Sequence, residues 1–416
     1  MLAHKTLFSC LFLSATLNAL YAQPLDLLIR GGRVIDPRNK IDSVLDVGIA
    51  DGKVVAVSEN ISAERAQTIV DASGLIVTPG LIDLHSHVFF GTEPNAYLSN
   101  GFSAVPPDGF TFRTGVTTVV DTGGAGWRNF YQFKEQVIER AQTRVLAMLN
   151  IVGSGMKGGP IEQNIGDMNP ILTAQRAKEY PELIVGIKVA HYLGGDWMPV
   201  DRAVEAGRLS QVPVMVDFGS HEPELSLESL LLTHLRPGDI LTHTYTDFRG
   251  RLPIVDPQGK LKPFVNEARA RGIVFDVGHG GGSFRFSQAV PAMNQGFPPD
   301  TISTDLHTSS MNAGMKDMLN VMSKFLNMGM SVADVVERST WNPARTINRD
   351  DLGHLSAGAV ADLTVLRETK GRFGFVDVSG GKLLGERKFE VELTVRAGQI
   401  VWDLNGLSRR LWDQES

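Results

Sequence analysis

The sequence predicts an α/β protein in which a (β/α)8 barrel, or TIM barrel, carries a small discontinuous β-sandwich domain. The chain of 416 residues is long enough for a barrel of about 250 residues and a second domain. Its middle alternates almost continuous apolar runs with helical patterns, as in a parallel sheet that is buried on both faces. Its two ends carry short β-type runs separated by Gly, Asp and Asn turn signals.

Residues 1–22 resemble a secretory signal peptide. Lys5 precedes an apolar stretch from Leu7 to Leu20, and the small Ala22 supplies a cleavage position. A membrane anchor is the alternative, but the stretch is short for a bilayer span and contains several polar residues. We therefore expect cleavage after Ala22 and a secreted or periplasmic protein that does not contact the membrane after cleavage.

The two ends of the chain after this signal share one pattern. "PLDLLIRGGRVIDP" near the start and "KFEVELTVRAGQIVWDL" near the end both read as strands with turn residues between them. We expect residues 23–78 and 356–416 to form one β-sandwich domain, and residues 79–355 to form the barrel.

The middle of the chain contains eight apolar strand-like runs. A doubly wound open sheet is the alternative to a barrel, but no Gly-rich dinucleotide fingerprint follows any run. The eight runs are "IVTPGLIDLHSH", "GVTTVVDT", "RVLAMLNIV", "LIVGIKVAHY", "VPVMVDFGSH", "GDILTHTY", "GIVFDVGHGGG" and "DTISTDLH".

The composition limits the chemistry. A hydrophobic content of 43% and a charged content of 21% are ordinary for a soluble enzyme, and the net charge of -6 argues against nucleic acid as a partner. The only cysteine, Cys10, lies in the expected signal, so the mature chain has no thiolate ligand. A transition-metal site must therefore use histidine and carboxylate. A small-molecule substrate is the expected partner, and a homo-oligomer stays open.

Two histidines end the first apolar run. Side chains at i and i+2 of a strand point to the same face, so His85 and His87 project to one side. Two converging neutral imidazoles are suited to a divalent metal. A pair of ordinary hydrogen-bonded histidines is the alternative that this spacing alone leaves open.

Other strand ends carry similar side chains, and the chemistry of a barrel lies at the C-terminal ends of its strands. The fourth, fifth, sixth and eighth runs carry Lys188, His221, His243 and Asp305. A lysine in a buried strand is costly unless it is paired or modified. His279 ends the seventh run, where it could support the site, face the substrate or serve the fold.

The whole pattern resembles the amidohydrolase superfamily, binuclear-metal subtype, over nearly all of the mature chain. "GLIDLHSH" is similar to its His-x-His motif, and "SAGAVADLTVL" to its return into the sandwich. The resemblance implies two divalent ions, best fitted by Zn²⁺ with Mn²⁺ and Co²⁺ as alternatives. It also implies an N6-carboxylysine at Lys188 that bridges them, and Asp305 as the catalytic proton acceptor and donor. The implied metal ligands are His85, His87, Lys188, His221, His243 and Asp305.

Loops after the strands supply candidates for substrate binding. The Gly-rich loop after the seventh run offers backbone N–H groups to a carboxylate, and a tyrosine could stabilise an oxyanion. An ordinary loop or packing role is open for each residue. The candidates are Tyr192, His279, Gly281, Gly282, Ser283, Arg285 and His307.

"VGIKVAHY" and "GHGGGSF" resemble a deacetylase branch of the superfamily, related to dihydroorotases. We therefore expect a metal-dependent hydrolase that cleaves an amide or ester bond of a small acylated amino or hydroxy acid, the acyl group being acetyl. One alternative is a cyclic amidase of the dihydroorotase type. Another is an inactive barrel that serves as a binding protein, although the retained ligand set favours an enzyme.

Overall fold

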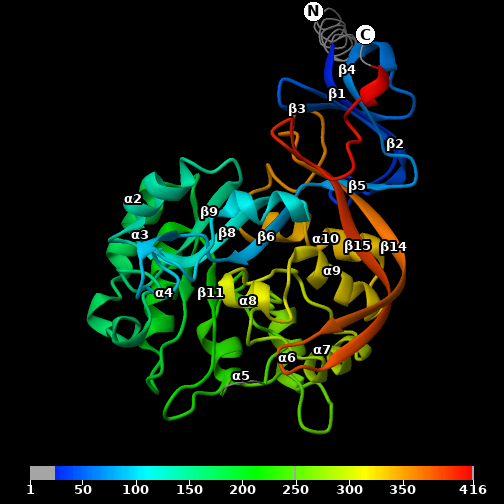
Figure 1. The fold of residues 1–416 in the computed structure, drawn as a ribbon. Helices are drawn as coiled ribbons and strands as arrows, with labels where there is room; N and C mark the ends of the chain where they lie inside the picture. The colour runs from blue at the N-terminus through cyan, green and yellow to red at the C-terminus, as the bar shows by residue number, and fades with distance from the viewer. Residues whose placement is uncertain (1–23, 248–249, 415–416) are drawn as a thin grey trace, which may run out of the picture.

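The computed structural model describes residues 24–247 and 250–414. It has two parts, a barrel surrounded by helices and a mainly antiparallel sheet built from both ends of the chain (Figure 1). The expected signal peptide, residues 1–22, lies outside the described residues. Within those residues, no helix is both long and apolar enough to cross a bilayer.

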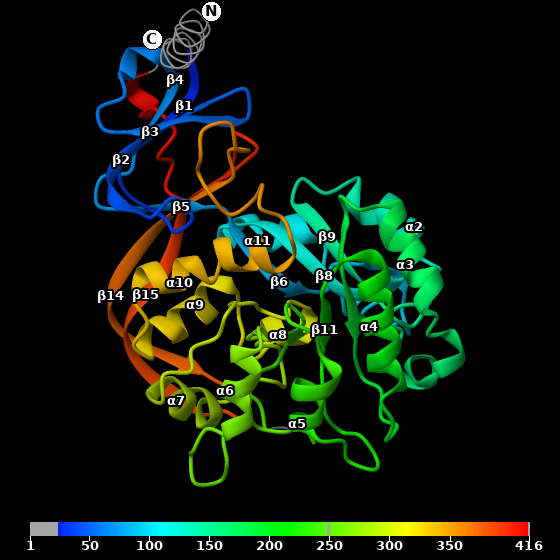
Figure 2. The same cartoon turned by 180° about the vertical axis from the view of Figure 1, so that it is seen from behind.

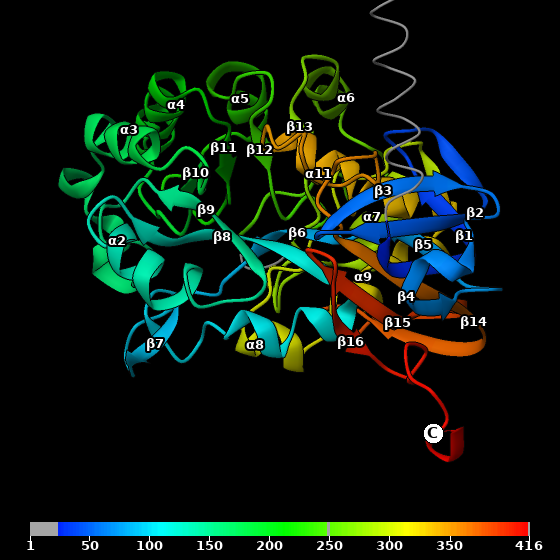
Figure 3. The same cartoon turned by 90° about the horizontal axis from the view of Figure 1, so that it is seen from above.

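Seven strands form the parallel sheet of the barrel, and each pairs with its neighbour in chain order. Figure 3 shows these strands curving round, with helices α3 to α6 outside them. The strands are β6 (Leu81–Ser86), β8 (Val116–Gly126), β9 (Arg144–Asn150), β10 (Ile184–Val189), β11 (Val214–Val216), β12 (Ile240–Leu241) and β13 (Val274–Phe275).

Residues 301–306 occupy the eighth strand position. Asp276, which directly follows β13, pairs in parallel with Thr301, and Ser86 of β6 pairs in parallel with Leu306. Backbone hydrogen bonds join the segment to both neighbours. The ring therefore closes between β13 and β6. The (β/α)8 barrel predicted from eight apolar runs is confirmed.

The strands are apolar throughout because both of their faces are covered. Ile82, Val120 and Met215 join one cluster with Ala344 of α11 (Trp341–Thr346), while other strand residues pack into a larger cluster with the surrounding helices. These helices include α3 (Pro170–Glu179), α4 (Met198–Ser210), α6 (Pro263–Ala270), α7 (Phe286–Asn294), α9 (Met318–Asn327) and α10 (Val332–Glu337). Shorter elements are α2 (Phe130–Phe133), α5 (Leu227–Ser229), α8 (Thr308–Asn312) and β7 (Phe90–Glu93).

The second sheet joins the two ends of the chain, as the sequence predicts. Its strand order is β16-β15-β14-β5-β1-β2-β3, with β4 beside β1, and the antiparallel β5–β14 pair connects the halves. The exact domain boundaries stay a prediction. The strands are β1 (Leu25–Asp36), β2 (Ile41–Ala50), β3 (Lys53–Ser58), β4 (Ala66–Asp71), β5 (Ile76–Pro79), β14 (Leu363–Val376), β15 (Lys382–Arg396) and β16 (Gln399–Asp403).

Strands β14 and β15 extend beyond the other strands of their sheet. They leave it as a two-stranded ribbon that runs down the side of the barrel past α9 and α7 (Figures 1 and 2). Phe389 and Val391 of β15 are buried in the cluster that packs around the barrel, and Phe389 N–H donates to Ser323 Oγ of α9 at 3.0 Å. The ribbon thus fastens the sheet to the barrel.

Candidate metal centre

A cavity of about 370 Å³ opens at the C-terminal ends of the barrel strands. An open groove between β5 and the β14–β15 ribbon is larger, but no histidine lines it. The smaller cavity is therefore the candidate site. Its polar lining is His85, His87, Tyr97, Lys188, His191, Asp217, His243, Arg251, Gly281, Gly282, Ser283, Asp305, His307 and Ser309.

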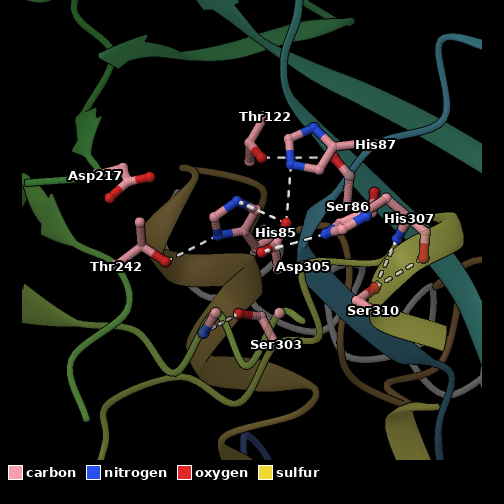
Figure 4. Close-up of polar contacts among 12 residues, drawn as sticks. His85, Ser86, His87, Thr122, Asp217, Thr242, Ser303, Asp305, His307 and Ser310 are labelled. Carbon is pink, nitrogen blue, oxygen red and sulfur yellow. Dashed lines mark hydrogen bonds and ion pairs between the residues drawn. The ribbon is translucent and has the colours of Figure 1, made fainter. Parts of the chain in front are cut away.

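Three buried side chains converge at one end of the cavity. The metal-binding atoms of His85, His87 and Asp305 all lie within 4.8 Å of one another. Asp305 Oδ1 lies 2.9 Å from His87 Nε2 and 3.6 Å from His85 Nε2 (Figure 4). Two imidazoles and a carboxylate at these separations fit one divalent ion.

A buried network fixes the tautomer of His85. Thr242 Oγ1 donates to Asp276 Oδ2 at 2.8 Å, and it lies 2.8 Å from His85 Nδ1. Since the single hydroxyl hydrogen goes to the carboxylate, Oγ1 must accept the Nδ1 proton. The lone pair of His85 then sits on Nε2, which faces Asp305. Metal-binding histidines are commonly oriented in this way by a partner of their other nitrogen.

His243 is oriented by a similar contact on the other side of the cavity. Its Nδ1 lies 2.6 Å from the carbonyl oxygen of Gly278, which can only accept, so Nδ1 carries the proton. Its Nε2 faces Asp217 Oδ2 at 3.4 Å. Asp217 in turn accepts two hydrogen bonds from Arg251, at 2.9 and 2.6 Å. In Figure 4, Asp217 lies on the side of the His85 ring away from His87.

Lys188 lies in the wall of the cavity and is 1% exposed. Its Nζ is 3.3 Å from His85 Nε2 and 3.5 Å from Met215 Sδ. No carboxylate of residues 24–247 or 250–414 lies within ion-pair distance of Nζ. Burial lowers the pKa of Lys188 to about 8, so a substantial fraction of the amine is neutral near that pH.

The charges in the cavity favour ionised carboxylates and neutral imidazoles. Burial opposes the charge of Asp305, but His85, His87 and His307 hold the pKa of Asp305 well below its usual range. Burial, with repulsion from Lys188, lowers the pKa of His85 to about 3, and burial lowers that of His87 to about 4. These are the protonation states in which such residues bind a divalent metal.

Three residues that line the cavity have left-handed backbone conformations. The angle φ is 57° at His191, 57° at His243 and 54° at Asp305. Such angles are uncommon outside glycine and cluster at functional sites, where the fold holds them in place. His191 and His243 lie two residues beyond the ends of β10 and β12, so the turn at each strand end aims a side chain into the cavity.

Comparisons with known proteins assign this site to a family. A model of the amidohydrolase family matches residues 286–401. A deacetylase of Agrobacterium fabrum is 34% identical over 358 residues, which cover 84% of this chain and 85% of that protein. The chain belongs to the amidohydrolase superfamily.

Other amidohydrolases give the same result. A deacetylase of Enterococcus faecalis is 29% identical and covers 90% of this chain. Among solved structures, an adenine deaminase matches with a TM-score of 0.81 and 28% identity, and a dihydroorotase with 0.79 and 31%; each match covers 91% of this chain. They cover 100% and 99% of those chains. The chain is therefore a metal-dependent hydrolase that acts on C–N bonds, as the sequence predicts.

The structure of this amidohydrolase places one expected ligand elsewhere. His85, His87, Lys188, His243 and Asp305 line the cavity, but His221 does not. It packs against the rings of Phe218 and Tyr192, and both of its ring nitrogens are buried without a hydrogen-bond partner among the described residues. Strand β11 ends at Val216, so Asp217, not His221, occupies the strand end.

Only some of the candidates for substrate binding line the cavity. Gly281, Gly282, Ser283 and His307 line the cavity, and their contact with a substrate stays a prediction. The other three do not line it. Tyr192 donates to Asp196 at 2.6 Å, Arg285 pairs with Asp247 at 2.6 Å, and His279 is fully buried against Phe284 and Lys324. Each of these three has a partner that accounts for its position.

Sequence reasoning missed five polar residues of the cavity, which are Tyr97, His191, Asp217, Arg251 and Ser309. Asp217 had a signal, because it is the first polar residue after the apolar run "VPVMV". His191 is not among the residues expected at the site, but its Nε2 lies 3.7 Å from Asp217 Oδ2 and its Nδ1 lies 2.8 Å from Glu162 Oε2. Arg251 lies in a loop with no motif that singles it out.

Gly278 has no side chain and therefore leaves room for the imidazole rings of His85 and His243. With φ at +44°, a Cβ there would collide with Thr242 Oγ1 and lie 3.0 Å from Nδ1 of both His85 and His243. Gly278→Ala should therefore weaken metal binding about 10–100-fold, measured by chelator competition. Gly296→Ala is the control, because Gly296 has φ of +75° but no atom near its Cβ position. Equal metal affinity in the two variants would contradict the prediction.

A second buried lysine gives a prediction about pH. Lys324 Nζ lies 2.6 Å from His279 Nε2 and donates to Gly314 O at 2.6 Å, and burial lowers its pKa to about 7. The unfolded state, with an ordinary lysine pKa, therefore binds more protons above pH 7, so stability rises with pH from about 7 towards 10. Lys324→Met should remove up to about 1.4 kcal/mol of this rise per pH unit.

Urea unfolding of both proteins between about pH 7 and 9 measures this difference. The variant also removes the contact of His279 Nε2 with Lys324, but this loss shifts stability equally at each pH. Parallel curves of unfolding free energy against pH would show that Lys324 is charged in the folded protein.

Proposed function

We propose that this amidohydrolase removes the acetyl group from a small N-acetylated or O-acetylated amino or hydroxy acid, with two divalent ions, best fitted by Zn²⁺. The observation that carries the proposal is the buried His85–His87–Asp305 cluster beside the buried Lys188 at the strand ends of a barrel. When bound at such a site, divalent ions lower the pKa of a water molecule and polarise a carbonyl group.

Lys188 fits an N6-carboxylysine in this proposal. The side chain is buried with no carboxylate of the described residues at ion-pair distance, and its lowered pKa supplies the neutral amine that reacts with carbon dioxide. A carbamate would convert a costly buried cation into an anion with two oxygen ligands. It would extend from Nζ, which lies 3.3 Å from the His85 ligand atom.

Asp305 has the position and charge of a proton acceptor. Its pKa lies well below the usual range, it lies in one cluster with His85 and His87, and its Oδ2 lies 3.9 Å from His307 Nε2. A carboxylate there can take a proton from the attacking water and deliver it to the leaving group. His307 can hold substrate near this carboxylate, since both residues line the cavity.

The rest of the cavity suits a small acid. Arg251 and His191 offer positive or donor groups, Gly281 and Gly282 offer exposed backbone, and Met156 lies with other apolar residues in the wall. Relatives named deacetylases also match over most of the chain, whereas a curated dihydroorotase matches over 32% of it. A cyclic amidase is the second candidate, because a solved dihydroorotase at 31% identity matches over 91%.

An activity panel tests the proposal. The zinc-loaded protein is assayed with N-acetyl amino acids, O-acetyl hydroxy acids, dihydroorotate and adenine. We expect the highest kcat/KM with an acetylated acid. Hydrolysis of dihydroorotate alone would favour the cyclic amidase, and metal binding without any turnover would favour a binding protein.

We also propose that the protein is exported, on the sequence of residues 1–22 alone. N-terminal sequencing of the protein from its native host should begin at Gln23. An intact Met1 terminus would contradict export by signal cleavage.

A further inference from the structure

The fifth barrel strand ends in a carboxylate. Asp217 directly follows β11, and its backbone N–H still donates to Val189 O of β10 at 3.0 Å. Its side chain is 6% exposed and lines the same cavity as Lys188 and His243. It therefore stands at the position from which the resemblance led us to expect a histidine ligand.

The contact between His243 and Asp217 needs a cation. His243 Nδ1 carries the proton that goes to Gly278 O, so Nε2 is the nitrogen left to present a lone pair to a metal. That lone pair faces Asp217 Oδ2 at 3.4 Å, and the two hydrogen bonds from Arg251 hold Asp217 as a carboxylate. Two acceptors that face each other in a buried site repel unless a positive charge lies between them.

The hydrogen bonds from Arg251 leave lone pairs of the Asp217 carboxylate free to bind another ligand. Its Nε and Nη2 donate to the two oxygens of Asp217 at 2.9 and 2.6 Å. A carboxylate has about four lone-pair positions, so about two are left for another ligand. The bidentate contact also fixes the orientation of Asp217, because the guanidinium group is planar and its donors are in a fixed fork.

We propose that Asp217 is the ligand that the fifth strand gives to the second divalent ion, together with His243 and carboxylated Lys188, and that Arg251 is the positioning residue that holds Asp217. This inference rests on the proposed two-ion function. His221, the expected ligand, plays no part in the centre.

The charges of Asp217 and Arg251 explain how a carboxylate can replace a histidine as the ligand from the fifth strand. An imidazole ligand is neutral, and Asp217 with Arg251 is also neutral as a pair, so the net charge of the centre is the same. The donor atom changes from nitrogen to oxygen, however. Oxygen ligands suit harder ions, so the second position should accept Mn²⁺ more readily than a histidine-ligated position would.

His221 is the alternative to Asp217 as a ligand of the second ion. Both of its ring nitrogens lack a hydrogen-bond partner among the described residues. In another rotamer, the His221 side chain would offer one of these nitrogens to a metal. It lies four residues beyond Asp217, next to Phe218 and Tyr192. Replacing each residue in turn distinguishes the two ligands directly.

The experiment is metal analysis of purified protein after exposure to Zn²⁺ and dialysis. We expect two ions per chain in the wild type and in His221→Ala, and one in Asp217→Asn, which keeps the shape of the side chain. Arg251→Met should lose affinity for the second ion about 10–100-fold in a Co²⁺ titration followed by visible absorption. Arg251→Lys should recover part of it, as a positioning role requires.

Two ions in Asp217→Asn, or one ion in His221→Ala, would each overturn the inference and leave the hydrolase proposal standing. A wild-type protein that binds a single ion would overturn both the inference and the two-ion part of the proposed function. A wild-type protein that binds no divalent ion would overturn the proposed function itself.

Discussion

Asp305→Asn should reduce kcat/KM by about 10³-fold while the protein stays folded. The amide has nearly the same shape as the carboxylate and keeps one oxygen, but it cannot accept a proton. It also loses the negative charge that faces His85 and His87 at 3.6 and 2.9 Å. Steady-state kinetics on the best acetylated substrate measure the loss, and metal analysis measures ligand loss separately.

Asp167→Asn is the matched control. Asp167 is also buried and accepts from Arg128 at 2.8 and 2.6 Å, but it does not line the cavity. We expect this variant to lose stability and to keep its kcat/KM. Activity in Asp305→Asn within a few-fold of the wild type would mean that another group accepts the proton.

Lys188→Met should reduce kcat/KM by at least about 10²-fold through weakened metal binding. Without the side-chain nitrogen there is no carbamate, and the ions lose a shared ligand. The metal-free variant should at the same time unfold at a higher urea concentration than the metal-free wild type, because a buried amine without an anionic partner is costly. Native mass spectrometry of the wild type should show the added mass of one carbon dioxide.

Lys324→Met is the control for this variant, because Lys324 is as buried as Lys188 but lies outside the cavity lining. It should keep its metal ions. A Lys188→Met protein with full activity, or a wild type without the added mass under carbon dioxide, would contradict the carboxylysine.

Residue periodicity and burial predict much of this architecture. The eight apolar runs correspond to the barrel strands because the side chains of a parallel barrel are buried on both faces. His85 and His87 converge because strand residues two apart share a face. Lys188 is recognisable because a charged residue within a buried apolar run costs free energy unless it is paired or modified.

The end of a strand is harder to locate from sequence than the strand itself. His221 was expected as a ligand because it ends the fifth apolar run and matches the strand-five ligand that the resemblance implies, but β11 ends at Val216 and the chain then turns through Gly219. The residue that follows the apolar run, Asp217, takes the strand-end position. A boundary error of a few residues is thus enough to place a different side chain at the end of the strand.

Contacts between distant segments explain the rest. Arg251 meets Asp217 from a loop 34 residues away, and His191 turns toward it through a left-handed backbone angle. The length of the β14–β15 ribbon is likewise set by its packing on the barrel, through residues such as Phe389. No local pattern in the sequence encodes these approaches.

The central claim is that the strand ends of this barrel hold the divalent ions that hydrolysis needs. Anomalous diffraction at the zinc absorption edge, on crystals of fully active protein, tests it most directly. We predict one peak among His85, His87 and Asp305 and a second between His243 and Asp217. Active crystals without an anomalous peak in this cavity would contradict the account.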